Sequence, residues 1–233
     1  MASRMPRRLP GAADIPSTAD IPVRDAATVV LVRRDAGAVR VLMGQRGTAA
    51  VFMPDKFVFP GGAVDPEDAD IGATVPLAPG TARRLAKGSD AHLGPALSVA
   101  AIRELWEETG LRLGCPATTI ETGWPGFERR PRTEALRLVF RAITPRGRPR
   151  RFDARFFMAE AADLDGSPDD FSAASGELRL LQWIDLAAAR RLPLPFVTEV
   201  VLSEIAAVLA DPDPERPVPF FTHDDEGSHF RLL

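Results

Sequence analysis

The sequence is poor in the residues that build disulfides, zinc clusters and membrane spans. Cysteine occurs once, at Cys115, so the chain forms no intrachain disulfide and no cysteine-based zinc site. The three histidines are scattered along the sequence and suggest no histidine-based metal site. No apolar run reaches the length of about 18 residues that a membrane span requires, and none follows the N-terminal arginines as in a secretory signal. We therefore expect a cytoplasmic protein with no membrane partner.

The charge of the chain excludes another class of partner. The formal net charge is -3, which leaves no basic footprint for nucleic acid. Lysine occurs only at Lys56 and Lys87, so nearly all of the 29 basic residues are arginine, whose planar fork suits phosphate and carboxylate groups. Hydrophobic residues make up 45% and charged residues 26%, as in globular proteins. We expect a folded protein that binds a small molecule and no nucleic acid.

The 233 residues fit one elaborated domain. We expect a loose arm over residues 1–24, a domain over 25–210 with an insertion at about 68–96, and a tail over 211–233. The apolar patterns predict strands over 27–33, 39–46, 57–59, 135–143, 152–158 and 178–184, and helices near 81–87 and over 94–109, 185–191 and 196–210. This order indicates α/β layers around one core.

The chemistry is concentrated between Arg103 and Leu111, on the longest predicted helix. Residues three and four apart are neighbours on a helix, so Glu104 lies beside Glu107 and Glu108. Carboxylates this close repel one another, which raises the pKa of at least one of them. A hard divalent cation such as Mg²⁺ or Mn²⁺ relieves that repulsion, because both ions favour oxygen ligands. An acidic helix face exposed to solvent is the alternative.

With the Phe-Pro-Gly-Gly turn upstream, these residues resemble the signature of the Nudix hydrolase family. Its first half is matched by Gly61 and Glu67, with five residues between them. Its second half is matched at every fixed position, by Arg103, Glu104, Leu105, Glu107, Glu108, Gly110 and Leu111. The spacer departs from the pattern, because residues 68–102 number 35 where the signature has seven. The resemblance implies the Nudix fold, a mixed β-sheet sandwiched between α-helices (α+β), with the extra residues forming a loop.

The resemblance also implies a role for each site residue. The ligands of Mg²⁺ or Mn²⁺ are expected to be Glu104, Glu107, Glu108 and the backbone carbonyl of Gly61. The general base is expected to be Glu107 or Glu108, with Glu177 as the candidate outside the signature. Arg103, in an ion pair with Glu67, and Gly62 are expected to orient these residues. Arg46 could bind a substrate phosphate and Phe52 could stack on a base, although surface exposure and packing are the alternatives.

The implied reaction is hydrolysis of a diphosphate bond in a nucleoside diphosphate linked to another group. The long spacer, and the spacing between Arg46 and Phe59, resemble a subgroup of CoA and acyl-CoA diphosphatases, although Ala50, Val51 and Met53 depart from that pattern. The alternatives are a diphosphatase for ADP-ribose, NADH or nucleotide sugars, a non-catalytic module that senses a nucleotide, and an isomerase. The resemblance is compatible with a homodimer, whose interface no residue specifies.

Overall fold

The long strand β1 (Val23–Asp35) lies at the centre of the sheet and faces two cores. Successive side chains of a strand point to opposite faces. Accordingly Val29 and Leu31 belong to one hydrophobic cluster, whereas Val30 and Val32 belong to a second cluster. All four are fully buried. The sheet is therefore covered on both faces, as the unbroken apolar run predicts.

The computed structural model describes residues 21–35, 37–48, 52–88, 92–116, 124, 126–224 and 227–233. Most of the predicted arm, residues 1–20, lies outside this set, while Val23 and Arg24 already form part of β1. No helix among the described residues is long and apolar enough to span a membrane.

The main sheet is mixed, with the order β11-β10-β7-β8-β1-β2-β3; in addition β4 pairs with β1 and β9 pairs with β2. The pairs β1–β8 and β7–β10 are parallel, and the other pairs are antiparallel. A two-stranded sheet, β5–β6, lies apart. The remaining strands are β2 (Ala38–Arg46), β3 (Phe57–Val58), β4 (Gly61–Ala63), β5 (Gly114–Cys115), β6 (Arg130–Pro131), β7 (Arg137–Ile143), β8 (Arg151–Glu160), β9 (Leu178–Asp185), β10 (Pro219–Asp224) and β11 (Gly227–Leu232).

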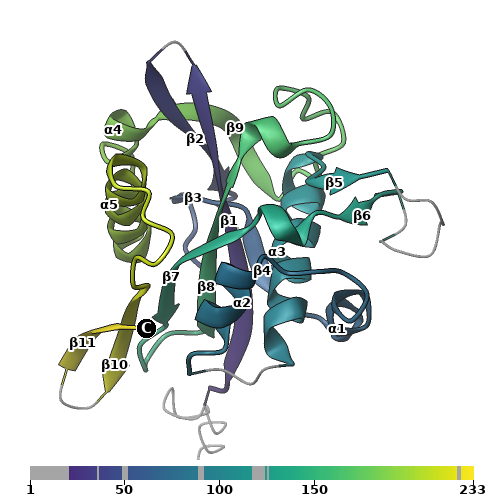
Figure 1. Cartoon of the computed structure of the whole chain (residues 1–233). Helices are drawn as coiled ribbons and strands as arrows, with labels where there is room; N and C mark the ends of the chain where they lie inside the picture. The colour runs from purple at the N-terminus through teal and green to yellow at the C-terminus, as the bar shows by residue number, and fades with distance from the viewer. Residues whose placement is uncertain are drawn as a thin grey trace, which may run out of the picture.

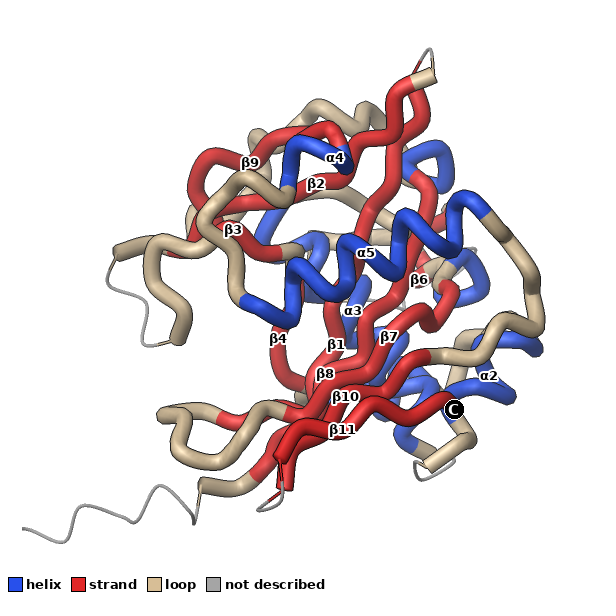
Figure 2. The backbone as a smooth tube through the Cα atoms, turned by 90° about the vertical axis from the view of Figure 1, so that its left-hand side faces the viewer, coloured by secondary structure: helices blue, strands red, loops and turns tan. Residues whose placement is uncertain are grey.

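Helices cover the two faces of this sheet (Figures 1 and 2). On one face α3 (Leu93–Thr109) packs on β1, accompanied by α1 (Pro66–Gly72) and α2 (Pro79–Leu85). The other face is covered by α5 (Phe196–Ala210) and the short α4 (Leu186–Ala189). Single 3-10 turns occur at Thr133–Ala135 and Ala161–Asp163. The predicted mixed sheet between helices is confirmed.

Two segments are more ordered than the sequence predicts. The insertion contains most of α1 and the whole of α2, and each helix has proline at its first turn. The segment expected to be a tail folds back as the hairpin β10–β11, whose first strand pairs with β7. Val218 and Phe221 of this segment are almost fully buried. The hairpin is therefore part of the sheet and its core.

Candidate functional site

The predicted site residues that the structure brings together come from four separate segments. The second half of α3 supplies Arg103, Glu104, Glu107 and Glu108. The other contributors are Gly61 and Gly62 on β4, Arg46 at the end of β2, and Glu177 immediately before β9. The helix ends as predicted at Gly110, which has a left-handed φ of 77° and donates its N–H to the carbonyl of Trp106 at 2.7 Å.

Glu108 is the most buried carboxylate of the site, with 3% of its side chain exposed. The backbone N–H of Gly61 donates to its Oε2 at 2.8 Å, and Arg46 Nη2 lies 4.0 Å from its Oε1. Burial raises the pKa of Glu108 to about 8, and the neighbouring Glu104 contributes further. In the absence of a cation this carboxyl group therefore retains its proton near neutral pH.

Glu104 lies directly against the backbone of Gly62. A Cβ at position 62 would be 2.2 Å from Glu104 Oε1, so only glycine leaves room for the carboxylate. Burial raises the pKa of Glu104 to about 7, opposed by Arg103 and assisted by Glu107. The predicted rise in pKa is confirmed, but its main cause is burial and not the repulsion between carboxylates.

The partner of Arg103 differs from the expected one. Its guanidinium donates from Nε to Asp68 Oδ1 and from Nη2 to Asp68 Oδ2, both at 2.9 Å. The Asp68 side chain is fully buried, whereas the expected partner, Glu67, is exposed. Asp68 also accepts the backbone N–H of Asp65 at 2.8 Å, at the start of α1. The folding of α1 therefore turns Asp68 inward and Glu67 toward solvent.

The remaining donors of Arg103 serve the carboxylates of α3. Arg103 Nη1 lies 2.9 Å from Glu104 Oε1 and 3.2 Å from Glu107 Oε2, and Nη2 donates to the carbonyl of Ala63 at 2.9 Å. One buried guanidinium thus joins α1, β4 and the acidic face of α3. This arrangement agrees with the expectation that Arg103 orients the acidic residues.

Arg46 lies between two carboxylates of the site, Glu108 and Glu177. Arg46 Nη1 donates to Glu177 Oε1 at 3.2 Å, and 59% of the Glu177 side chain is exposed. The preceding loop is fixed to the end of α3, because the N–H of Ser175 donates to the carbonyl of Glu107 at 3.0 Å. Glu177 is therefore held at the rim of the site, where solvent reaches it.

Phe52 is engaged in a packing contact. Its ring meets that of Phe152, near the start of β8, edge to face with centroids 5.6 Å apart. Such a contact stabilises the fold by about 1 kcal/mol beyond the area that it buries. Its expected role in stacking on a substrate base remains a prediction.

The donor set suits a hard divalent cation in its chemistry. The acidic face of α3 offers only oxygen ligands, and burial disfavours the charged forms of Glu104 and Glu108 as long as no cation is bound beside them. In the present conformation, no group of three or more His, Cys, Asp or Glu side chains among the described residues is arranged to hold a metal ion. The positive charge that contacts Glu104 and Glu107 in this conformation is the guanidinium of Arg103, through its Nη1.

Comparison with known proteins finds similarity to proteins named as Nudix hydrolases. A Caenorhabditis elegans protein provisionally named nudix hydrolase 7 is 27% identical over 194 residues. The match covers 82% of this chain and 46% of that protein, so the chain spans about half the length of this curated relative. No protein-family model matches the chain.

Among solved structures, a NUDIX hydrolase from Alicyclobacillus acidocaldarius superposes with a TM-score of 0.61 at 27% identity, covering 81% of this chain and 93% of that chain. An Ap4A hydrolase from C. elegans superposes with a TM-score of 0.46 at 20% identity, covering 81% of this chain and 98% of that chain. The chain shares the fold of the Alicyclobacillus protein over four fifths of its length.

Proposed function

We propose that this chain, a Nudix hydrolase by its fold and its relatives, hydrolyses a diphosphate bond in a nucleoside diphosphate linked to a second group. The observation that carries the proposal is that Glu108 and Glu104 of α3 lie against Gly61 and Gly62 of β4, while Arg103 joins Glu104 to Glu107. The exposed Glu177 and the guanidinium of Arg46 complete a site with both acidic and basic groups.

Glu104, Glu107, Glu108 and the carbonyl of Gly61 would hold Mg²⁺ or Mn²⁺ in this proposal. When bound, such a cation neutralises the phosphate oxygens and lowers the pKa of a water molecule. Arg103 and Asp68 keep the carboxylates in position from behind. Arg46 would bind a phosphate of the substrate, since its fork already points toward carboxylates at the site.

A carboxylate of the site accepts the proton of the attacking water in this proposal. Glu107 and Glu108 are the first candidates, and Glu177 is the third. Glu177 and Glu107 are both partly exposed, with 59% and 43% of their side chains accessible, so a water molecule can reach either one. Glutamine variants of the three residues show which one is the base. Replacing the base should lower kcat, and kcat should rise again at high pH, where hydroxide takes over the role of the base.

The first substrate class that we propose is CoA or acyl-CoA, which would yield adenosine 3′,5′-bisphosphate and a 4′-phosphopantetheine compound. Its support is the resemblance of the segment between Arg46 and Phe59 to that subgroup, together with the long insertion. The second class is ADP-ribose, NADH or a nucleotide sugar, and a non-catalytic nucleotide sensor is the alternative outside enzymes.

Product analysis tests the whole proposal. The chain is incubated with CoA, acetyl-CoA, ADP-ribose, NADH and a nucleotide sugar, each with Mg²⁺, Mn²⁺ or a chelator, beside the variant Glu108→Gln. Metal-dependent cleavage of CoA compounds that the variant loses supports both the reaction and the substrate class. Cleavage of another compound alone retains the reaction and rejects CoA. If the folded, metal-loaded protein cleaves none of them, the hydrolase assignment fails for these substrates.

A further inference from the structure

A second cavity lies outside the carboxylate site, where the insertion meets the segment that leads into β10. Its volume is about 190 Å³, and it is lined by α2, by Lys87, by residues 214–217 and by Leu233. Figures 1 and 2 show α2 near the end of the chain, on the side of the sheet that also carries α3.

Positive charge dominates the wall. Four basic residues, Arg83, Arg84, Lys87 and Arg216, face one acidic residue, Glu215. Arg83 pairs with Glu215 at 3.0 Å, but both side chains are largely exposed, so the pair is weak. Water and salt screen such a pair, and the acidic group neutralises little of the surrounding charge.

The two central cations meet no negative group within the described residues. Arg84 donates to the carbonyl oxygens of Pro214 and Arg216, which are neutral acceptors. Lys87 is exposed just beyond the end of α2, and its ammonium has no hydrogen bond or ion pair with another described residue. The ammonium of Lys87 and part of the Arg84 fork are therefore available to a ligand.

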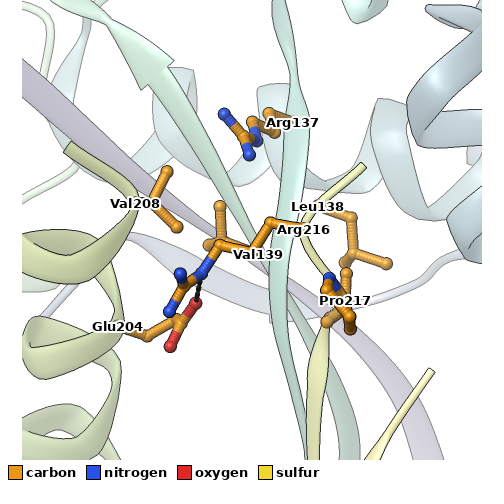
Figure 3. A pocket seen from close by; sticks show the side chains of 8 residues that line it. Arg137, Leu138, Val139, Glu204, Val208, Arg216 and Pro217 are labelled. Atoms are coloured by element: carbon orange, nitrogen blue, oxygen red, sulfur yellow. Dashed lines mark hydrogen bonds and ion pairs between the residues drawn. The ribbon is translucent and has the colours of Figure 1, made fainter. Parts of the chain in front are cut away.

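Further basic groups lie behind this wall. Arg137 of β7 donates to the carbonyls of Pro212 and Asp213, at 3.5 Å and 2.6 Å. Burial, followed by the charge of Arg84, lowers the pKa of Arg137. Arg216 differs from Arg84 and Lys87, because its charge is already paired with an acidic group. Its Nε lies 2.9 Å from Glu204 of α5 (Figure 3). On the cavity wall itself, the charge that no acidic group of the described residues pairs with is therefore that of Arg84 and Lys87.

We propose that this cavity, which we call the α2 cavity, binds a small compound bearing two linked phosphate groups. Guanidinium forks and ammonium groups form short, charge-assisted hydrogen bonds with phosphate oxygens. The volume of about 190 Å³ is several times the ~30 Å³ share of one water molecule, yet below the ~300 Å³ of a typical site for a drug-sized ligand. A diphosphate fits these limits.

Binding there would connect parts of the chain that are distant in sequence. The anion would add to the links that Arg83 and Arg84 already form between α2 and residues 214–216. Because the ligand binds the folded protein and not the unfolded chain, it should raise the melting temperature. This effect depends on neither metal nor catalysis, so it is independent of the proposed hydrolysis.

Inorganic diphosphate is the probe for the test, used with the full chain, a chelator and constant ionic strength. Calorimetry should give saturable binding, with a parallel rise in melting temperature. Lys87→Gln should weaken binding about fivefold, and adding Arg83→Gln should bring the loss to roughly tenfold or more. The matched control is Arg148→Gln, which removes an exposed cation between β7 and β8 and should leave binding unchanged.

A variant that should bind diphosphate more tightly distinguishes loss of the site from loss of binding through misfolding. Glu215→Gln removes the acidic group of the wall and should tighten binding about threefold. Three results overturn the proposal: no saturable binding at millimolar diphosphate, equal affinity for monophosphate or sulfate at the same ionic strength, or affinities that the variants at 83, 87 and 215 leave unchanged. The last result would place the anion at another site.

Discussion

The guanidinium of Arg103 and the carboxylate of Asp68 face each other through two hydrogen bonds of 2.9 Å, although 35 positions separate the residues in sequence. The side chains are 7% and 0% exposed. This buried, two-pronged ion pair ties the first helix of the insertion to the helix that carries the acidic residues. The first helix of the insertion therefore helps to hold the acidic residues of the site in place.

Removing the carboxylate of Asp68 should destabilise the protein strongly. Asp68→Ala leaves the buried charge of Arg103 without its main partner, for which we expect a loss of about 3 to 5 kcal/mol in the free energy of unfolding. Urea unfolding measures it. The matched control is Glu67→Gln on the exposed face of α1, which should change stability by less than about 0.5 kcal/mol. Equal effects of the two substitutions would contradict the ion pair.

The stability of the metal-free protein should fall as pH rises. Burial raises the pKa of Glu108 to about 8 and that of Glu104 to about 7, from 4.5 for an unperturbed glutamate. Below about pH 4.5 both carboxyl groups are protonated in the folded and in the unfolded protein, so they do not lower the free energy of unfolding. Between about pH 4.5 and 8 the unfolded chain releases protons that the folded protein keeps, so the free energy of unfolding decreases.

Urea unfolding at pH 5, 6, 7 and 8 in the presence of a chelator tests this dependence. Glu108→Gln should flatten the decline and make the protein more stable than the wild type at pH 8, because glutamine has no proton to lose. Glu128→Gln, at an exposed position, serves as the control and should keep the wild-type slope. A wild-type slope in the Glu108 variant would show that another group causes the decline.

Gly62→Ala should weaken metal binding without unfolding the protein. The new methyl group would lie 2.2 Å from Glu104 Oε1, so the carboxylate must move away from β4. We expect at least a roughly tenfold loss of Mn²⁺ affinity, comparable to the effect of disturbing groups that orient metal ligands. Gly47→Ala is the control, because its methyl group would approach no described atom closer than 3.9 Å. Unchanged affinity in Gly62→Ala would exclude Glu104 as a ligand.

Arg46 should affect substrate binding more than the chemical step. Loss of its charge-assisted hydrogen bond to a phosphate corresponds to about a tenfold rise in KM for Arg46→Gln. Arg46→Lys keeps the charge and should recover part of the loss. Arg40→Gln, on the same strand, is the control with unchanged kinetics. If Arg46→Gln lowers kcat alone, then Arg46 acts mainly by holding Glu177.

The local features of the site could be predicted from the sequence because they depend on helix geometry. The acidic face of α3 and the glycine that ends it follow from the spacing between Glu104 and Gly110. The partner of Arg103 could not be found this way. Spacing favours Glu67, but the start of α1, with Asp65 before Pro66, turns Asp68 toward the core. The spacing from Asp65 to Asp68 is the signal that could have identified it.

Long-range pairing accounts for the other differences. Strand β10 follows a segment rich in proline and acidic residues, which resembles a tail until Phe220 and Phe221 pair with β7. The dominance of burial in the pKa of Glu108 likewise depends on β4 closing over α3, because Gly61 and Glu108 are 47 positions apart. Neither contact leaves a periodic pattern in the sequence.

The parallel pairing of β1 with β8 also determines the order in which the protein can form during synthesis. Val23 is aligned with Arg151 and Val32 with Glu160, so the central strand emerges from the ribosome long before its partner exists. Contacts between such distant residues slow folding. Until β8 has been made, the apolar run from Val29 to Val32 lacks one of its two neighbouring strands, and exposed apolar strands of this kind favour aggregation.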